Sequence, residues 1–245
     1  MPPAPTTLAA PNAMRKALSR ARCLVLDLDG PVARVFAGEP AGDIARVMLD
    51  IAEKDGCLVE ALRDSTDPIA VLYAHTQEKE ARDGRGGWDE VVAKMHDALD
   101  AYERKAAESA VPTPGAADFI KACRDSGRTL AVATNNHEDV AIRILERLLV
   151  LDCFDGRIVG RSRDATLMKP NPDSLRRAKA PGVPVEQHLM IGDAGTDYRA
   201  ALALGMPFYG YHRSDSGRRR LDAAGVKSIA TSMTEFYRAA RDLGR

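Results

Sequence analysis

The chain has 245 residues, of which 45% are hydrophobic and 29% are charged, as in an ordinary globular protein. That length accommodates one large domain, or a core domain that carries an insertion. Because 35 acidic residues balance 35 basic ones, no overall field favours nucleic acid or an anionic membrane. The run Arg218–Arg220 and the pair Arg161 and Arg163 are expected to be solvated surface rather than phosphate-binding groups.

The cysteines and the N-terminal segment both bear on the compartment. Four cysteines form no C-x-x-C pair, which predicts free thiols in a reducing compartment. No apolar run of about 18 residues is present to span a membrane. The first residues are rich in Pro, Ala and Thr and lack the basic start and apolar stretch of a signal peptide. We expect residues 1–20 to form a disordered tail, with Met14 as an alternative start, and the protein to be cytoplasmic.

Short apolar runs that end at polar or glycine-containing loops predict buried parallel strands. They are Cys23–Leu26, Thr129–Ala133, Ile158–Val159 and Leu189–Ile191, with weaker candidates at 208–210 and 227–230. Helical segments lie between them, at 116–125, 138–149, 171–179 and 198–204. Strands that alternate with helices predict a Rossmann-like, doubly wound α/β core. This core would comprise residues 21–33 and 111–245.

Residues 34–110 have a different pattern. Apolar residues recur at helical spacing in 43–54, 68–81 and 88–107, and no strand-like run interrupts them. The segment predicts an all-helical domain inserted after the first strand. Its two histidines, His75 and His96, are expected to be partly exposed helix residues, since the five histidines show no metal-ligand spacing.

Polar side chains follow the predicted strands where each strand ends. Ligands of open α/β sheets bind beyond these carboxyl ends, so one crevice should collect the side chains that follow. They are Asp27, Asp29, Thr134, Asn135, Lys169, Asp193 and Asp197. Four carboxylates in one place would repel each other and raise each other's pKa values. A hard divalent cation relieves that repulsion, and Mg²⁺ binds carboxylates together with substrate phosphate.

Four motifs in this crevice resemble those of the haloacid dehalogenase-like superfamily. Asp27-Leu28-Asp29-Gly30 resembles the first motif, and Thr134 after an apolar strand resembles the second. Lys169 in the sequence KPNPD resembles the third, and residues 192–197 (GDAGTD) resemble the fourth. Their order and spacing agree, and the helical insertion stands where family members carry a cap of the first type. Within the superfamily the chain is most similar to phosphoglycolate-phosphatase-like members.

The resemblance implies a magnesium-dependent phosphatase. In that family, the residue matching Asp27 attacks phosphorus to form an aspartyl-phosphate, and the one matching Asp29 serves as general acid and base. Thr134 and Lys169 would bind phosphoryl oxygens, and Asn135 would touch phosphate or substrate. The implied metal ligands are Asp27, the backbone carbonyl of Asp29, and Asp193, with Asp197 as a direct or water-mediated support.

The implied substrate is a small soluble phosphomonoester such as phosphoglycolate, a sugar phosphate or a nucleoside monophosphate. No nucleic acid or membrane partner is expected, and the protein would be a monomer or a homodimer. Pro31 and Val32 stand where many relatives have Thr-Leu, which leaves the substrate class open. Two alternatives also stay open, a phosphomutase of the same fold and a member that binds without catalysis.

Overall fold

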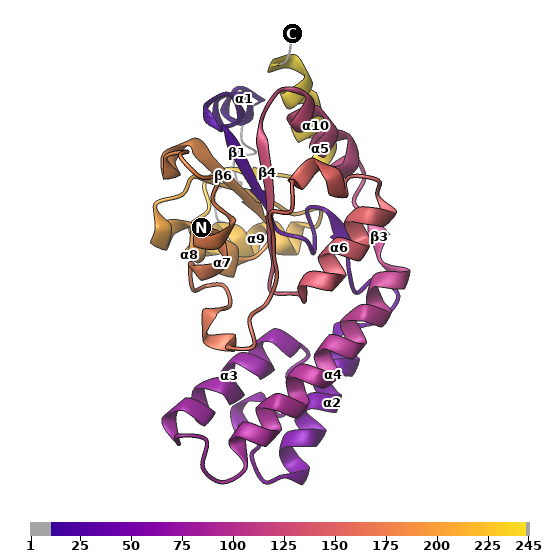
Figure 1. The fold of residues 1–245 in the computed structure, drawn as a ribbon, viewed down its shortest axis with the longest axis vertical. Coiled ribbons are helices and arrows are strands. Elements are labelled where there is room, and N and C mark those ends of the chain that lie inside the picture. Colours follow the sequence, from indigo (N-terminus) through magenta and orange to yellow (C-terminus); the bar gives the residue numbers. More distant parts are fainter. Residues whose placement is uncertain (1–10, 244–245) are drawn as a thin grey trace, which may run out of the picture.

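The computed structural model describes residues 11–243, which form a parallel α/β core and a helical cap (Figure 1). The strands of the six-stranded sheet lie in the order β5 (Ile158–Val159), β4 (Thr129–Ala133), β1 (Cys23–Leu26), β6 (His188–Gly192), β7 (Phe208–Tyr211) and β8 (Ile229–Ala230). Leu26 at the end of β1 lies opposite Val132 of β4 and Ile191 of β6. The strand order reverses at β1, so the loops after β1, β4 and β6 meet at a switch point where ligands of such sheets bind.

Helices cover both faces of the sheet because alternate strand residues point to opposite sides. On one side Leu24 and Leu26 pack with the apolar residues of four helices. These are α1 (Pro11–Arg20), α5 (Ala116–Asp125), α6 (Glu138–Arg147) and α10 (Met233–Leu243). On the other side Cys23 and Val25 pack with α7 (Asp173–Ala178) and α8 (Gly195–Leu204). Helix α9 (Asp215–Ala223) packs on β8 through Leu221.

The N-terminal segment departs from the predicted disorder of residues 1–20. Residues 11–20 form α1, so the prediction is wrong for them, while residues 1–10 lie outside the described part of the chain. Met14 and Leu18, one helical turn apart, are buried in the core cluster. Arg15 forms an ion pair with Asp242 of α10. A single apolar pair in a segment with a Pro- and Ala-rich start was too weak a pattern to predict this helix.

The cap consists of α2 (Ala41–Lys54), α3 (Pro68–Ala81) and α4 (Trp88–Ser109), which surround their own apolar cluster. Two short antiparallel strands, β2 (Ala33–Arg34) and β3 (Val111–Pro112), pair where the chain leaves and re-enters the core. Figure 1 shows the cap at one end of the molecule, with the long helix α4 running back toward the core. Residues 11–243 also contain the 3-10 turns η1 (Glu60–Leu62), η2 (Leu151–Phe154), η3 (Ala165–Leu167) and η4 (Val185–Gln187).

The predicted fold class, a Rossmann-like core with a helical insertion after the first strand, is confirmed. The prediction for the cap histidines is wrong, because His75 and His96 are both buried. His75 Nδ1 lies 2.7 Å from the carbonyl oxygen of Val71, which satisfies the ring inside the cap. All four cysteines are buried free thiols, as predicted. None of the helices within residues 11–243 combines the length and the apolar character that crossing a membrane requires.

Candidate active site

The structure brings together three of the predicted carboxylates at the carboxyl ends of β1 and β6. Oxygens of Asp27, Asp193 and Asp197 all lie within 4.8 Å of one another. Asp27 follows β1 directly, and Asp193 follows β6. Asp197 lies in the first turn of α8, where its Oδ2 accepts the backbone N–H of Ala194 at 3.0 Å. Two strand ends and one helix start therefore place the three carboxylates in one crevice.

Glycines allow these loops to approach so closely. Gly30 has a φ of +100°, a conformation that L side chains rarely adopt. A Cβ at Gly30 would overlap the carboxylate of Asp193, and a Cβ at Gly192 would overlap that of Asp197. Gly30 is thus required by the contact between the loop after β1 and the loop after β6, and Gly192 by the contact between the end of β6 and the first turn of α8.

Lys169 neutralises part of this negative charge. Its Nζ lies 2.8 Å from Oδ1 of Asp27 and 2.6 Å from Oδ1 of Asp197, and it donates to the carbonyl of Ala133 at 2.8 Å. All three ammonium protons therefore have an acceptor within the protein. Burial opposes the charge, but Asp197 and Asp27 hold the pKa of Lys169 above its ordinary value. The residue stays a cation in this site.

Within residues 11–243, Lys169 is a single cation against three carboxylates and leaves part of their negative charge unbalanced. Burial raises the pKa of Asp27 to about 7, against the opposing effect of Lys169. Burial, together with Asp27 and Asp197, raises the pKa of Asp193 well above its ordinary value. Closely spaced, buried oxygen donors with one cation among three carboxylates suit a hard divalent cation, which favours the ionised carboxylates. The residues present therefore fit Mg²⁺.

Asp29 stands apart from the carboxylate cluster. Its Oδ1 accepts the backbone N–H of Val35 at 2.9 Å, which fixes the side chain at the start of the linker to the cap. Burial raises the pKa of Asp29, while its hydrogen bonds to backbone N–H groups lower it. The predicted metal ligand of this residue is its backbone carbonyl, and that role stays a prediction. Its role in proton transfer likewise stays a prediction.

Thr134 and Asn135 follow β4, as predicted. The side chain of Thr134 hydrogen-bonds with Asn136, and that of Asn135 with the backbone of Lys169. The hydroxyl of Thr134 donates to Oδ1 of Asn136 at 3.1 Å and accepts the N–H of that residue at 3.1 Å. Asn135 Oδ1 accepts the backbone N–H of Lys169 at 2.9 Å, and its Nδ2 donates to the Lys169 carbonyl at 3.1 Å. The amide of Asn135 thus holds the backbone of Lys169 on both sides.

A buried cap–core network, formed by Asp100 and Glu103 of α4 with Asn136 and Arg161 of the core, was missed from sequence. Arg161 forms ion pairs with Asp100 and with Glu103, the latter at 2.8 Å, and its side chain is only 1% exposed. The prediction that Arg161 is solvated is therefore wrong. The Arg163 side chain is 63% exposed, as predicted, and reaches Asp100 at 3.3 Å. The i, i+3 spacing of Asp100 and Glu103 on one helix was the only signal available.

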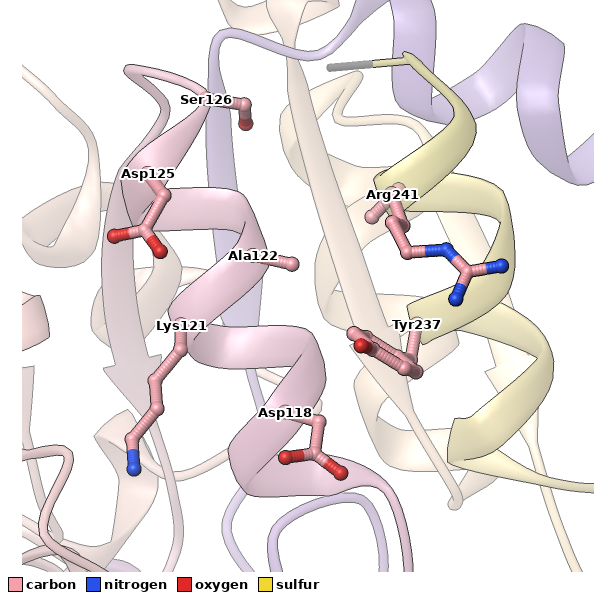
Figure 2. A pocket seen from close by; sticks show the side chains of 8 residues that line it. Asp118, Lys121, Ala122, Asp125, Ser126, Tyr237 and Arg241 are labelled. Atoms are coloured by element: carbon pink, nitrogen blue, oxygen red, sulfur yellow. The ribbon is translucent and has the colours of Figure 1, made fainter. Parts of the chain in front are cut away.

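A surface groove between α5 and α10 is separate from this site. Its volume is about 370 Å³, and Asp118, Lys121, Tyr237 and Arg241 are among the residues that line it. In Figure 2, Ala122 of α5 and Tyr237 of α10 point toward one another across it. Neither helix carries any residue of the four motifs, so the groove has no part in the chemistry of the crevice.

A Rossmann-like core, a helical cap and an acidic crevice with a buried lysine at the switch point define a capped hydrolase of the α/β class. A family model described as haloacid dehalogenase-like hydrolase matches residues 21–205. The chain belongs to the haloacid dehalogenase-like hydrolase family, as its motifs predicted.

Named relatives and solved structures are consistent with this family. The chain is 32% identical over 131 residues to a phosphoglycolate phosphatase of Salmonella typhimurium, covering 51% of this chain and 50% of that one. It is 36% identical over 105 residues to a phosphoglycolate phosphatase of Rhodospirillum rubrum, covering 41% and 43%. The crystal structure of a predicted phosphatase from Clostridium acetobutylicum superposes with a TM-score of 0.64 at 23% identity, covering 88% and 96%. The aligned region spans about half the length of the curated relatives or less.

Proposed function

We propose that the protein is a Mg²⁺-dependent phosphatase that hydrolyses a small phosphomonoester through an aspartyl-phosphate on Asp27. The observation that carries the proposal is the pairing of buried Asp27 with Lys169 beside Asp193 and Asp197. Phosphoryl transfer depends mainly on positioning and on neutralising charge. A buried carboxylate held against a lysine, in a crevice suited to a divalent cation, supplies both.

Each side chain has a separate role in this proposal. A carboxylate oxygen of Asp27 attacks phosphorus, and Asp29 gives a proton to the leaving alcohol and later takes one from the hydrolytic water. Thr134 and Lys169 bind phosphoryl oxygens. Since the ammonium protons of Lys169 are all in use, a phosphoryl oxygen must take over one of its three contacts.

The metal site would use Asp27 and Asp193, the backbone carbonyl of Asp29, and Asp197 as support. Bound Mg²⁺ would supply neutralisation of the negative charge on the phosphoryl group. Asn135, which sequence reasoning placed at the substrate, fits a positioning role better, because both ends of its amide bind the backbone of Lys169. Asn135 would thereby keep the ammonium group of Lys169 against the carboxylate of Asp27.

The substrate class rests on the cap and on the relatives. Two relatives are named phosphoglycolate phosphatases, which makes phosphoglycolate the first substrate to test, followed by sugar phosphates and nucleoside monophosphates. Ala165 and Met168 belong to the core loop that carries Lys169, and they pack into the apolar cluster of the cap. The cap would thus cover the crevice and select the leaving group.

The decisive experiment measures phosphate release from a panel of phosphomonoesters, with Mg²⁺ and then with excess chelator. We expect release that requires Mg²⁺ and that D27N lowers by at least about a thousandfold. The control is D125N, because Asp125 is an exposed residue whose ion pair, within the described part of the chain, is with the neighbouring Arg124 at 3.0 Å. Release by D27N at the rate of the control would overturn the mechanism. No release from the wild type would favour a phosphomutase or a member that binds without catalysis.

A further inference from the structure

A charged residue of the cap is linked to the proposed phosphate-binding threonine by an unbroken series of hydrogen bonds. Glu103 of α4 is fully buried, and its Oε2 accepts the backbone N–H of His137 at 2.7 Å. Its Oε1 accepts from Nδ2 of Asn136 at 3.1 Å. Asn136 in turn accepts the hydroxyl of Thr134 at 3.1 Å. The link therefore runs from the cap helix through one amide to the active-site hydroxyl.

The carboxylate of Glu103 fixes the direction of each bond in this series. An ionised carboxylate only accepts hydrogen bonds, so Asn136 must turn its NH₂ group toward Glu103 and its oxygen toward Thr134. The Thr134 hydroxyl then donates to Asn136, and its oxygen accepts the backbone N–H of Asn136 at 3.1 Å. With the opposite amide orientation, two NH₂ protons would face the hydroxyl and the carboxylate would lose a donor.

Burial makes this arrangement costly to disturb. Glu103, Asp100 and the side chain of Arg161 are all nearly inaccessible to solvent. A buried charge that loses its partner is strongly destabilising. The guanidinium of Arg161 lies 2.8 Å from Glu103 and also donates to the carbonyl of Asn135 at 2.9 Å. The same ion pair thus joins the cap to the loop after β4 at Asn135 and Asn136.

We infer that Glu103 is a positioning residue, which fixes the place of the Thr134 hydroxyl through Asn136 and makes phosphate binding depend on the docked cap. A phosphoryl oxygen then takes over the hydroxyl proton from Oδ1 of Asn136, since the hydroxyl has only one. This inference rests on the proposed function, since it takes Thr134 as a phosphate ligand. Glu103 touches neither substrate nor metal in it. Its effect is transmitted by the orientation of one amide.

The test compares E103Q with E108Q, a matched control on the same helix. Glu108 is exposed and lies 3.7 Å from Arg143, so its amide variant changes one surface charge only. A glutamine at position 103 keeps only one acceptor oxygen, so its NH₂ group faces either Nδ2 of Asn136 or the backbone N–H of His137. We expect E103Q to weaken the binding of inorganic phosphate, measured calorimetrically with Mg²⁺, and to lower kcat/KM, each by about tenfold or more, while E108Q leaves both unchanged.

A double-mutant cycle separates positioning from simple damage to the fold. With Thr134 replaced by Ala, the phosphate affinity should no longer respond to E103Q, because the group that Glu103 positions is gone. If E103Q lowered the phosphate affinity equally in the wild type and in T134A, the inference would be overturned. Wild-type phosphate affinity in E103Q would overturn it as well.

Two further outcomes also decide the role of Glu103. If E103Q fails to fold by circular dichroism, N136L removes the middle link instead, and it should weaken phosphate binding to the same extent; unchanged binding would overturn the inference. If the wild type binds phosphate but releases none from any ester, the proposed function fails, while the phosphate affinities still decide the role of Glu103.

Discussion

The ammonium group of Lys169 lies 2.8 Å from Oδ1 of Asp27, and both groups are buried. At this distance the two charges stabilise each other in a place where neither would remain charged alone. Asp197 is the second partner, at 2.6 Å. The pairing is therefore part of the fold as well as of the proposed chemistry, and its removal should affect both.

We expect K169M to lower the free energy of unfolding of the metal-free protein by on the order of 3 kcal/mol, because two buried carboxylates lose their shared cation. The measurement is urea denaturation near neutral pH. K94M is the control, since Lys94 also has two carboxylate partners, Asp55 and Glu90, each at 2.9 Å, but is half exposed. The control should lose much less stability, because exposed ion pairs contribute little to it. Equal losses in the two variants would contradict a special role for burial at Lys169.

The proposed metal site predicts a stability effect that needs no substrate. Mg²⁺ should raise the melting temperature of the wild type, because it binds the folded state alone. In D193N this increase should be lost. The metal-free D193N protein should itself melt higher than the metal-free wild type, since burial and neighbouring carboxylates raise the pKa of Asp193 and its charge is unfavourable without a cation. D125N serves again as the surface control, and an undiminished Mg²⁺ effect in D193N would place the ion elsewhere.

Asp29 should matter most for substrates with poor leaving groups. Its role as general acid predicts that D29N lowers kcat/KM for an alkyl phosphate by about a hundredfold or more. For p-nitrophenyl phosphate, whose leaving group needs no proton, the loss in kcat/KM should be less than about tenfold. The value of kcat/KM depends only on the steps up to release of the leaving alcohol or phenol. The later hydrolysis of the aspartyl-phosphate therefore does not affect it. Equal losses for the two substrates would exclude proton donation by Asp29.

The sequence was sufficient to predict those candidate site residues that directly follow a strand. Asp27 and Asp193 follow apolar runs that form β1 and β6, and parallel strands bring such positions to one edge. Gly30 and Gly192 were part of the motifs, and the structure shows that contacts with Asp193 and Asp197 require them. Each of these features lies within a few residues of a strand end, so a short sequence motif is enough to predict it.

Features that depend on tertiary packing could not be predicted in this way. Glu103 and Arg161 are 58 residues apart along the chain, and the i, i+3 spacing of Asp100 and Glu103 does not by itself indicate that these charged side chains face the core. Asn135 was expected at the substrate because of its place after β4, whereas the fold brings the backbone of Lys169 against it. Position relative to a strand end predicts the region of a side chain but not its partner.

The buried histidine of α4 predicts how stability depends on pH. Burial, together with the positive charges of Arg161 and Arg163, lowers the pKa of His96 to about 4, while Asp100 acts in the opposite sense. In the unfolded chain the pKa of a histidine is near 6.5. Between these two values the unfolded state binds the additional proton, so the free energy of unfolding should fall as the pH decreases through this window. The full effect is at most about 3 kcal/mol.

H96Q tests this contribution by comparison with the wild type. Urea denaturation at several pH values from about 7.5 down to about 4.5 should give a shallower pH dependence for the variant, because a glutamine takes up no proton in either state. Burial also lowers the pKa values of His75, His188 and His212, so some dependence should remain in both proteins, and only the difference belongs to His96. Parallel curves would mean that His96 takes up a proton equally in the folded and unfolded states, and would contradict the lowered pKa of this residue.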